Sequence, residues 1–179
     1  TKLGIQQATD LGKRLKNIHF DAVFSSDAAR AKRTAEIISL EKELTVETTE
    51  LLREKSYGAH EGKPINIYET ELKQHLEQYE ALADEQKWSF KFPSIETDEA
   101  AVGRIITHLR EISLAYRGKT VLMVTHGTVM RLLLIRLGFG TYSDFQHTAS
   151  SIGNGAYVKL ESDGIDFKIL ETDNITKSN

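Results

Sequence analysis

The chain has 179 residues, of which 40% are apolar and 27% are charged, and this composition excludes an intrinsically disordered protein. Its 23 Lys and Arg residues are outnumbered by 26 Asp and Glu residues, so the net charge of -3 argues against nucleic acid as a partner. Disulfides and thiolate nucleophiles are excluded because cysteine is absent, and without a membrane-spanning run or a signal peptide we expect a cytoplasmic protein with no membrane partner.

The first part of the chain alternates between helical and extended patterns. Thr1 precedes an amphipathic helix whose apolar spacing continues to Ile18, and the Thr1 hydroxyl is a suitable N-cap. Residues 21–25 are expected to form a short buried strand, and residues 28–40 the helix that follows it. Residues 45–52 are rich in Thr and Val, which predicts an extended segment.

The middle of the chain is more polar. We expect a loop over residues 58–64, a polar helix over residues 66–84 and an aromatic loop over residues 88–93 that ends in proline. Thr97 is then positioned to cap the most clearly amphipathic helix, whose apolar face continues to Tyr116.

Residues 120–125 form a continuous apolar run, which is typical of a central strand covered on both faces of a parallel sheet. His126 and Gly127 then lead into a predicted helix over residues 128–137. A buried strand that runs directly into a helix is a common setting for a ligand site in an α/β sheet.

The end of the chain is predicted to be a hairpin followed by a tail. Residues 156–161 and 166–171 have strand character around a turn at 162–164, and residues 173–179 are expected to be a frayed polar tail. The alternation of strands and helices predicts an α/β fold with a mostly parallel central sheet and helices on both faces, in one domain over residues 1–172.

Two predicted strand ends carry polar groups and lead directly into helices. One has Ser26 followed by Arg30 on the first helical turn, and the other has His126 and Gly127. Helix N-termini favour anions, a guanidinium group matches phosphate oxygens, and an imidazole can add positive charge near neutral pH. Glycine permits close approach of a ligand to the backbone. We therefore expect a phosphate-sized anion between these two strand ends.

Glu54 follows a predicted extended segment and could donate a proton to a leaving group if it lies at the same edge of the sheet. The ordinary alternative for Glu54, as for Arg30, is a solvated side chain on the surface. His60 and Glu61 lack the second histidine of a zinc-binding helix, and neither a nucleotide-binding loop nor a serine nucleophile elbow is present. We therefore expect no metal and no cofactor.

Four segments, residues 1–8, 25–35, 52–62 and 124–127, match in order and spacing the motifs of one family. The chain thereby resembles the histidine phosphatase superfamily, also called the phosphoglycerate mutase-like family. The resemblance implies a sheet with helices on both sides, no required metal and a small phosphorylated substrate. It also implies that residues 64–97 are an insert beside the substrate.

The resemblance implies a role for each candidate residue. Arg30 would bind the transferring phosphoryl group, with Ser26 and Gly127 as further binding residues. Glu54 would protonate the leaving oxygen, and His126 would be the second histidine of the pocket. The family's nucleophile is the histidine of an Arg-His-Gly motif at the end of a strand before the first helix.

This sequence starts at the helix that follows that strand, so we expect the first strand and the nucleophile to be absent from it. The expected activity is hydrolysis of small phosphomonoesters through a phosphohistidine intermediate in the complete protein, with the fragment alone inactive. One alternative is a phosphoglycerate-type mutase, although residues 64–97 form a moderate insert that is not basic, which favours hydrolysis. Another is a non-catalytic domain that binds a phosphorylated ligand or a partner. The sequence names neither the substrate nor the oligomeric state.

Overall fold

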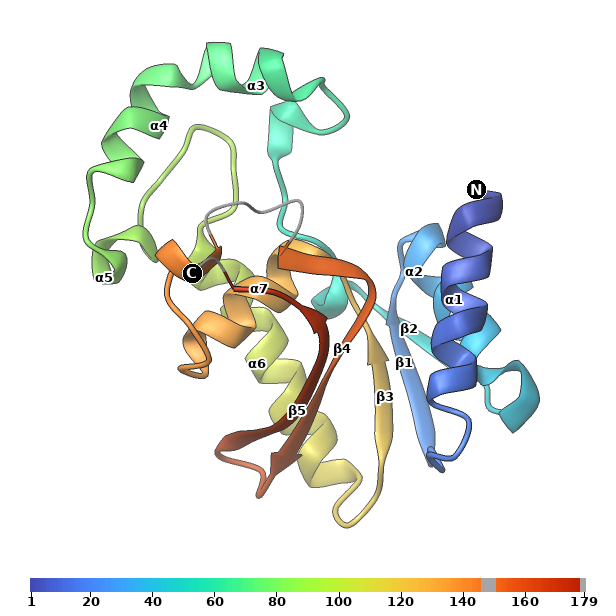
Figure 1. Cartoon of the computed structure of the whole chain (residues 1–179). Coiled ribbons are helices and arrows are strands. Elements are labelled where there is room, and N and C mark those ends of the chain that lie inside the picture. Colours follow the sequence, from blue (N-terminus) through green and yellow to red (C-terminus); the bar gives the residue numbers. More distant parts are fainter. Residues whose placement is uncertain (146–150, 178–179) are drawn as a thin grey trace.

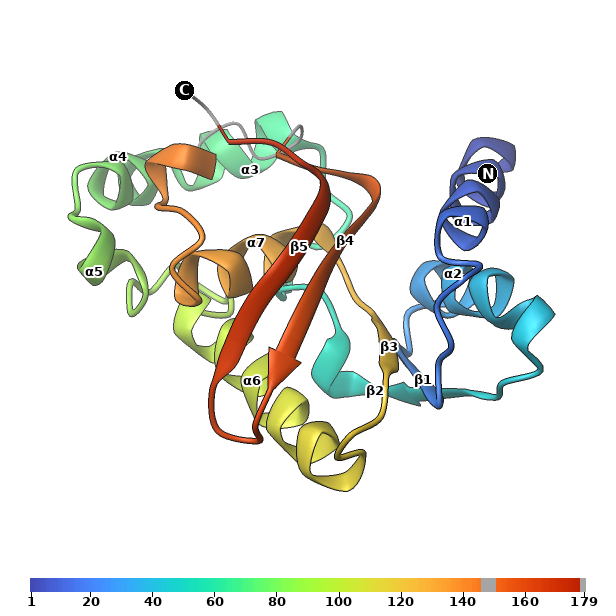
Figure 2. The ribbon, with the colours of Figure 1, turned by 60° about the horizontal axis from the view of Figure 1, so that its bottom comes forward.

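The computed structural model describes residues 1–145 and 151–177 of the chain. A parallel sheet lies between two layers of helices, and a hairpin and a group of short helices lie beside it (Figure 1). This arrangement confirms the predicted α/β fold, and Figure 2 shows the layers from a second direction.

The sheet contains β1 (Ala22–Ser26), β2 (Val46–Thr49) and β3 (Val121–Val124) in the order β2-β1-β3. All pairings are parallel, and Phe24 of β1 lies opposite Met123 of β3. Because the strands are parallel, their carboxyl ends meet at one edge, where polar side chains can leave the core.

One face of the sheet is covered by α1 (Lys2–Arg14) and α2 (Ala29–Ser39), which pack against each other. The Thr1 hydroxyl caps α1 as predicted, because it accepts a hydrogen bond from the Gly4 N–H at 3.1 Å. The helix ends at Arg14, earlier than the sequence pattern suggests, while the apolar residues beyond it still reach the core. That part of the core contains Leu11, Leu15, Ile18, Phe20 and Ile38, with Leu122 of β3 packed against it.

The opposite face is covered by α6 (Asp98–Ala115) and α7 (Gly127–Arg136), which also pack together. Phe24 of β1 and Met123 of β3 point into this layer. Alternate residues of β3 therefore face opposite helical layers, as the two-residue period of a strand requires.

The predicted helix over residues 66–84 is wrong in its continuity, because the structure divides this region into three helices that arch away from the sheet (Figure 1). They are α3 (Ile65–Glu71), α4 (Lys73–Glu80) and α5 (Asp84–Lys87). Leu72 leaves the helical conformation with φ -109° and ψ 12°, and its side chain is buried against Phe92. A straight helix would not let this segment fold over its own aromatic loop. Short 3-10 helices complete the chain: η1 (Leu40–Lys42), η2 (Glu50–Leu52), η3 (Gly58–His60) and η4 (Ser143–Phe145).

The predicted hairpin is present but longer, with β4 (Ile152–Ser162) antiparallel to β5 (Phe167–Ile175). The predicted tail therefore begins inside a strand: Asp173 pairs in register with Tyr157 and forms an ion pair with Arg14. Polar residues remain in a strand here because backbone pairing and this ion pair hold them. Residues 178–179 of the predicted tail lie outside the described residues.

β3 differs from the expectation of a central strand that is covered on both faces. Among the described strands it pairs only with β1, and the β4–β5 hairpin forms a separate sheet. All four residues of β3 are half-buried, whereas all five residues of β1 are buried. The apolar run at residues 121–124 therefore has the composition of a central strand and the surroundings of an edge strand.

Candidate active site

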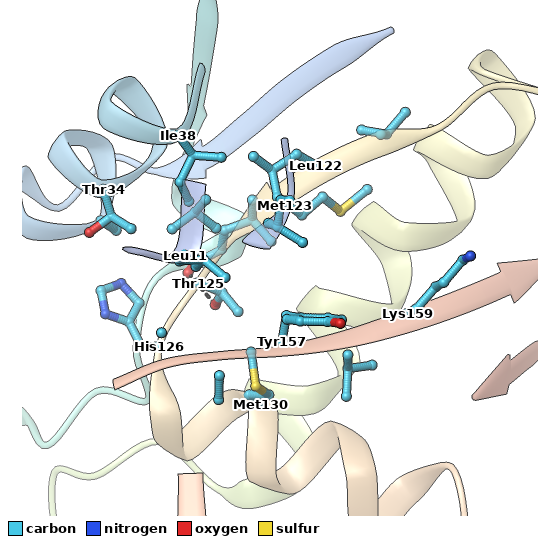
Figure 3. A pocket seen from close by; sticks show the side chains of 18 of the residues that line it. Leu11, Thr34, Ile38, Leu122, Met123, Thr125, His126, Met130, Tyr157 and Lys159 are labelled. Carbon is cyan, nitrogen blue, oxygen red and sulfur yellow. Dashed lines mark hydrogen bonds between the residues drawn. The ribbon is translucent and has the colours of Figure 1, made fainter. Parts of the chain in front are cut away.

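Four of the five predicted site residues line one cavity, which extends along β3 to the carboxyl end of that strand. Arg30, Glu54, His126 and Gly127 all contribute to its wall, and its volume is about 1180 Å³. Figure 3 shows His126 at one end of this cavity, with Tyr157 of β4 across from β3. The structure thus brings together residues that are almost 100 positions apart in the sequence, as the parallel topology requires.

Ser26 lies behind this wall and reaches the cavity only through His126. Its side chain is completely buried, its Oγ accepts a hydrogen bond from the Ala28 N–H at 3.2 Å, and it lies 2.8 Å from Nε2 of His126. The serine at the end of β1 therefore fixes the orientation of the imidazole at the end of β3.

His126 is itself buried at the N-terminus of α7. Burial and the nearby positive charge of Arg30 lower the pKa of His126 below its ordinary value. This direction favours the neutral imidazole. A bound anion would favour the protonated form, so anion binding here is coupled to proton uptake.

Glu54 accepts three backbone hydrogen bonds. Its Oε1 accepts from the N–H groups of Lys55 at 2.9 Å and Val129 at 3.1 Å, and its Oε2 accepts from the Thr128 N–H at 3.1 Å. Two of these donors belong to the first turn of α7, so the carboxylate occupies the position that favours anions at that helix. This contact holds Glu54 beside His126, at the edge of the sheet where the sequence predicted it.

Arg104 of α6 positions the segment that carries Glu54. Its guanidinium donates to the carbonyl oxygens of Leu51 at 2.9 Å, Arg53 at 2.7 Å and Glu54 at 3.0 Å, and it forms an ion pair with Glu96 at 2.9 Å. Sequence analysis missed this residue. No local pattern marks Arg104, because the carbonyl groups that it binds lie about 50 positions away and become neighbours only in the folded chain.

Arg30 is exposed on the first turn of α2 and lines the same cavity as Glu54. The start of this helix is held by Asp27, whose carboxylate accepts from Nε of Arg53 at 2.8 Å and from Nη2 of Arg53 at 2.5 Å. The Arg53 guanidinium lowers the pKa of Asp27. This two-point contact links the residue after β1 to the segment that carries Glu54.

A second buried cluster joins the short helices to the site. Asp98 at the start of α6 accepts from Nζ of Lys55 at 2.5 Å, from the Tyr79 hydroxyl at 3.1 Å and from the Tyr142 hydroxyl at 3.0 Å. Because Lys55 follows Glu54 directly, this network is a second set of contacts from α6 that holds the Glu54 segment. It too was missed, since its members come from distant parts of the sequence.

Within residues 1–145 and 151–177, no group of three or more His, Asp or Glu side chains is placed to hold a metal ion. Over the same ranges, every helix is too short or too polar to cross a bilayer.

The chain is similar to known proteins over most of its length. The family model described as "Histidine phosphatase superfamily (branch 1)" matches residues 1–175. The chain is 31% identical over 137 residues to "Uncharacterized phosphatase PhoE" of Bacillus subtilis, covering 76% of this chain and 63% of that protein. It is 28% identical to the adenosylcobalamin/alpha-ribazole phosphatase of Escherichia coli, covering 76% of this chain and 66% of that protein.

A solved structure shows the same fold. "Bacillus stearothermophilus YhfR" superposes with a TM-score of 0.80 and 26% identity, covering 94% of this chain and 81% of that chain. The chain is also 31% identical over 144 residues to a 2,3-bisphosphoglycerate-dependent phosphoglycerate mutase of Methylobacterium, covering 76% of this chain and 67% of that protein. The similar proteins are thus phosphatases and a mutase, and the chain spans less than two thirds of PhoE.

Proposed function

Because the chain belongs to the histidine phosphatase superfamily, we propose that the complete protein hydrolyses small phosphomonoesters through a phosphohistidine intermediate. The observation that carries this proposal is the convergence of Arg30, Glu54 and His126 on one cavity at the N-terminus of α7. Phosphatases among the similar proteins support the reaction class.

The proposed reaction has two displacements at phosphorus. In the first, a histidine nitrogen bonds to phosphorus, the phosphorus–oxygen bond to the leaving group breaks, and Glu54 gives a proton to the leaving oxygen. In the second, water attacks phosphorus while Glu54 accepts a proton from it, and the nitrogen–phosphorus bond breaks. The nucleophilic histidine would be supplied by polypeptide that precedes Thr1 in the longer protein.

Each residue of the site has a separate task in this proposal. Arg30 binds the equatorial oxygens of the phosphoryl group, and the N–H of Gly127, which lines the same cavity at the start of α7, adds a backbone donor. His126 takes up a proton as the anion binds and then stabilises the developing charge. Ser26 keeps the imidazole in place from behind.

Hydrolysis of p-nitrophenyl phosphate tests the proposal. The 179-residue chain would be compared with an N-terminally extended chain that carries the upstream residues, and both would be assayed for phosphoglycerate interconversion to detect a mutase. We expect turnover only from the extended chain, with more hydrolysis than interconversion. A 179-residue chain that turns over substrate and depends on His126 would overturn the assignment of roles.

Binding of inorganic phosphate tests the pocket separately from turnover. In the extended chain, Arg30→Ala should raise the phosphate inhibition constant at least about tenfold, since a charge-assisted hydrogen bond contributes about 1.5–3 kcal/mol. Lys32→Ala is the matched control, because Lys32 is an exposed cation on the same helix that does not line the cavity. Equal inhibition of the two variants would exclude Arg30 from the pocket. A phosphate-binding protein without any turnover would favour the non-catalytic alternative.

A further inference from the structure

The strand β4 is irregular near its start. Its regular pairing with β5 is interrupted over residues 153–156, and on β5 only Asn174 lies opposite these four residues. Such a bulge leaves extra residues of one strand outside the regular ladder. Asn154 and Gly155 lie in the middle of the bulge, and both also line the cavity.

Asn154 is exposed, and no described residue forms a hydrogen bond with its side-chain amide. The main chain around it is held more firmly. The Asn154 carbonyl accepts a hydrogen bond from Nδ2 of Asn174 at 3.0 Å, and the Gly155 carbonyl accepts one from Nη2 of Arg14 at 2.7 Å. The backbone is therefore fixed next to a side chain that no hydrogen bond restrains.

The residue that follows an asparagine decides how easily its backbone nitrogen can approach the asparagine side chain. Gly155 has no Cβ to block this approach, and its φ of 69° is a conformation that glycine adopts readily. The other asparagines in the described part of the chain are also exposed, but each is followed by isoleucine, whose branched Cβ crowds the backbone nitrogen. They are Asn17, Asn66 and Asn174. Asn154 is therefore distinguished by its neighbour and not by its exposure.

We propose that Asn154 is a site of spontaneous deamidation in the folded chain. The backbone nitrogen of Gly155 attacks Cγ of Asn154 and passes its proton through water to the side-chain nitrogen, whose bond to Cγ breaks so that ammonia leaves. The intermediate is a five-membered succinimide ring that includes the main chain. Water then opens the ring at either carbonyl, so the overall change consumes one water molecule and releases one ammonia molecule.

The two ways of opening the ring give an aspartyl or an isoaspartyl residue. Both products carry one more negative charge, which changes the net charge of the chain by one unit, from -3 to -4. Only the isoaspartyl product adds a carbon atom to the main chain, directly before Gly155. A bulge accommodates this lengthening better than a regular ladder does, because its residues have no fixed partners. Since Asn154 lines the cavity, either product places a carboxylate on the cavity wall.

The turn of the β4–β5 hairpin contains an aspartate followed by glycine, which can form the same ring by losing water. There the Gly164 N–H donates a hydrogen bond to Oγ of Ser162 at 3.0 Å, and Oδ1 of Asp163 accepts two backbone hydrogen bonds. The attacking nitrogen and the side chain that it would attack are thus both engaged. We therefore expect less isoaspartate at Asp163 than at Asn154.

Incubation of the 179-residue chain at mildly alkaline pH tests the proposal. Peptide mapping by mass spectrometry locates deamidation as a gain of about 1 Da, and a methyltransferase that labels isoaspartyl carboxylates measures the isoaspartate. The same chain unfolded in guanidinium chloride gives the reaction rate without the fold. We expect the rate at Asn154 in the folded chain to lie within about tenfold of the unfolded rate, because local opening of an irregular segment costs little free energy. At the Asn-Ile sequences we expect no detectable change over the same time.

Three variants assign the reaction to its position. Asn154→Gln keeps the amide but lengthens the side chain by one methylene, so that a six-membered ring would be required, and modification at this position should disappear. Asn66→Gln is the matched control, because it makes the same change at an exposed Asn-Ile sequence on α3 and should leave the rate at Asn154 unchanged. Asn154→Asp introduces the added charge directly and marks the position of the charged product in isoelectric focusing. Circular dichroism of all three variants checks that the fold is retained.

Three outcomes would overturn the proposal. The first is a rate at Asn154 that is more than about tenfold lower in the folded chain than in the unfolded chain, because the fold would then hold the bulge closed. The second is an unchanged amount of isoaspartate in Asn154→Gln, and the third is isoaspartate that forms mainly at Asp163. None of these measurements requires phosphatase activity, so the deamidation site and the proposed function can fail independently of each other.

Discussion

β1 and β3 lie side by side in register and have similar apolar sequences, yet their surroundings differ. Phe24 of β1 is 7% exposed and has a strand on either side, whereas Met123 opposite it is half-buried on a strand with one described neighbour. Both side chains face the layer of α6 and α7. The comparison shows that the central strand of this sheet is buried between two neighbours, while β3, which has one strand neighbour among the described residues, is only half-buried.

The largest expected effect on stability is that of a change in the central strand, β1. Phe24→Ala should lower the free energy of unfolding by about 3–5 kcal/mol, because it removes a buried ring that has edge contacts with His108 and Tyr116. Urea unfolding of the 179-residue chain measures this loss. A loss below about 1 kcal/mol would show that β1 is no better packed than β3.

The matched change in β3, at Met123, should lower the unfolding free energy by less. Met123→Ala should lower the unfolding free energy by about 1–2 kcal/mol, below the usual range of about 2–5 kcal/mol for a fully buried methionine, because its side chain is only half-buried. The same urea experiment compares the two variants directly. If Met123→Ala costs as much as Phe24→Ala, β3 is fully covered in solution and the comparison fails.

The pH dependence of the unfolding free energy tests the surroundings of His126, at the end of β3. The lowered pKa of His126 means that the unfolded chain binds its proton more readily, so stability falls as the pH drops below about 6.5. The slope for one such group is at most about 1.4 kcal/mol per pH unit. In His126→Asn this slope should be smaller between pH 7 and 5.

The control for this measurement is His19→Asn, because the His19 side chain is 89% exposed. Its slope over the same pH range should match that of the original chain. An unchanged slope in His126→Asn would show that this imidazole titrates normally and is not shielded by Ser26 and the wall of the cavity.

The smallest expected effect concerns the contact between α1 and the β4–β5 hairpin. Arg14 of α1 forms an ion pair with Asp173 of β5 and donates through Nη2 to the Gly155 carbonyl at 2.7 Å. Both charged side chains are about two fifths exposed, so a double-mutant cycle should give a coupling of about 0.5–1 kcal/mol. Coupling well above this range would mean that this ion pair is a principal contact between α1 and the hairpin.

Much of the site was predictable because its signals are local. His126 follows an apolar run and precedes a helix, and Arg30 follows Ser26 by one helical turn. Each strand end can therefore be recognised from the residues next to it. Glu54 was predicted from its place after an extended segment, but its bonds to the first turn of α7 were not. Arg104 and Asp98 were missed because every group that they bind comes from elsewhere in the chain.

The sequence alone determined the alternation of strands and helices, the α/β class and the residues at the two strand ends, because hydrophobic period and helix caps are local properties. Only the tertiary structure decided that Leu72 interrupts a helix, that Asp173 continues a strand and that β3 pairs with β1 alone among the described strands. These features depend on which neighbours a residue meets after folding. The apolar composition of residues 121–124 does not indicate how many strands pair with them. The burial of this strand therefore depends on the rest of the folded chain.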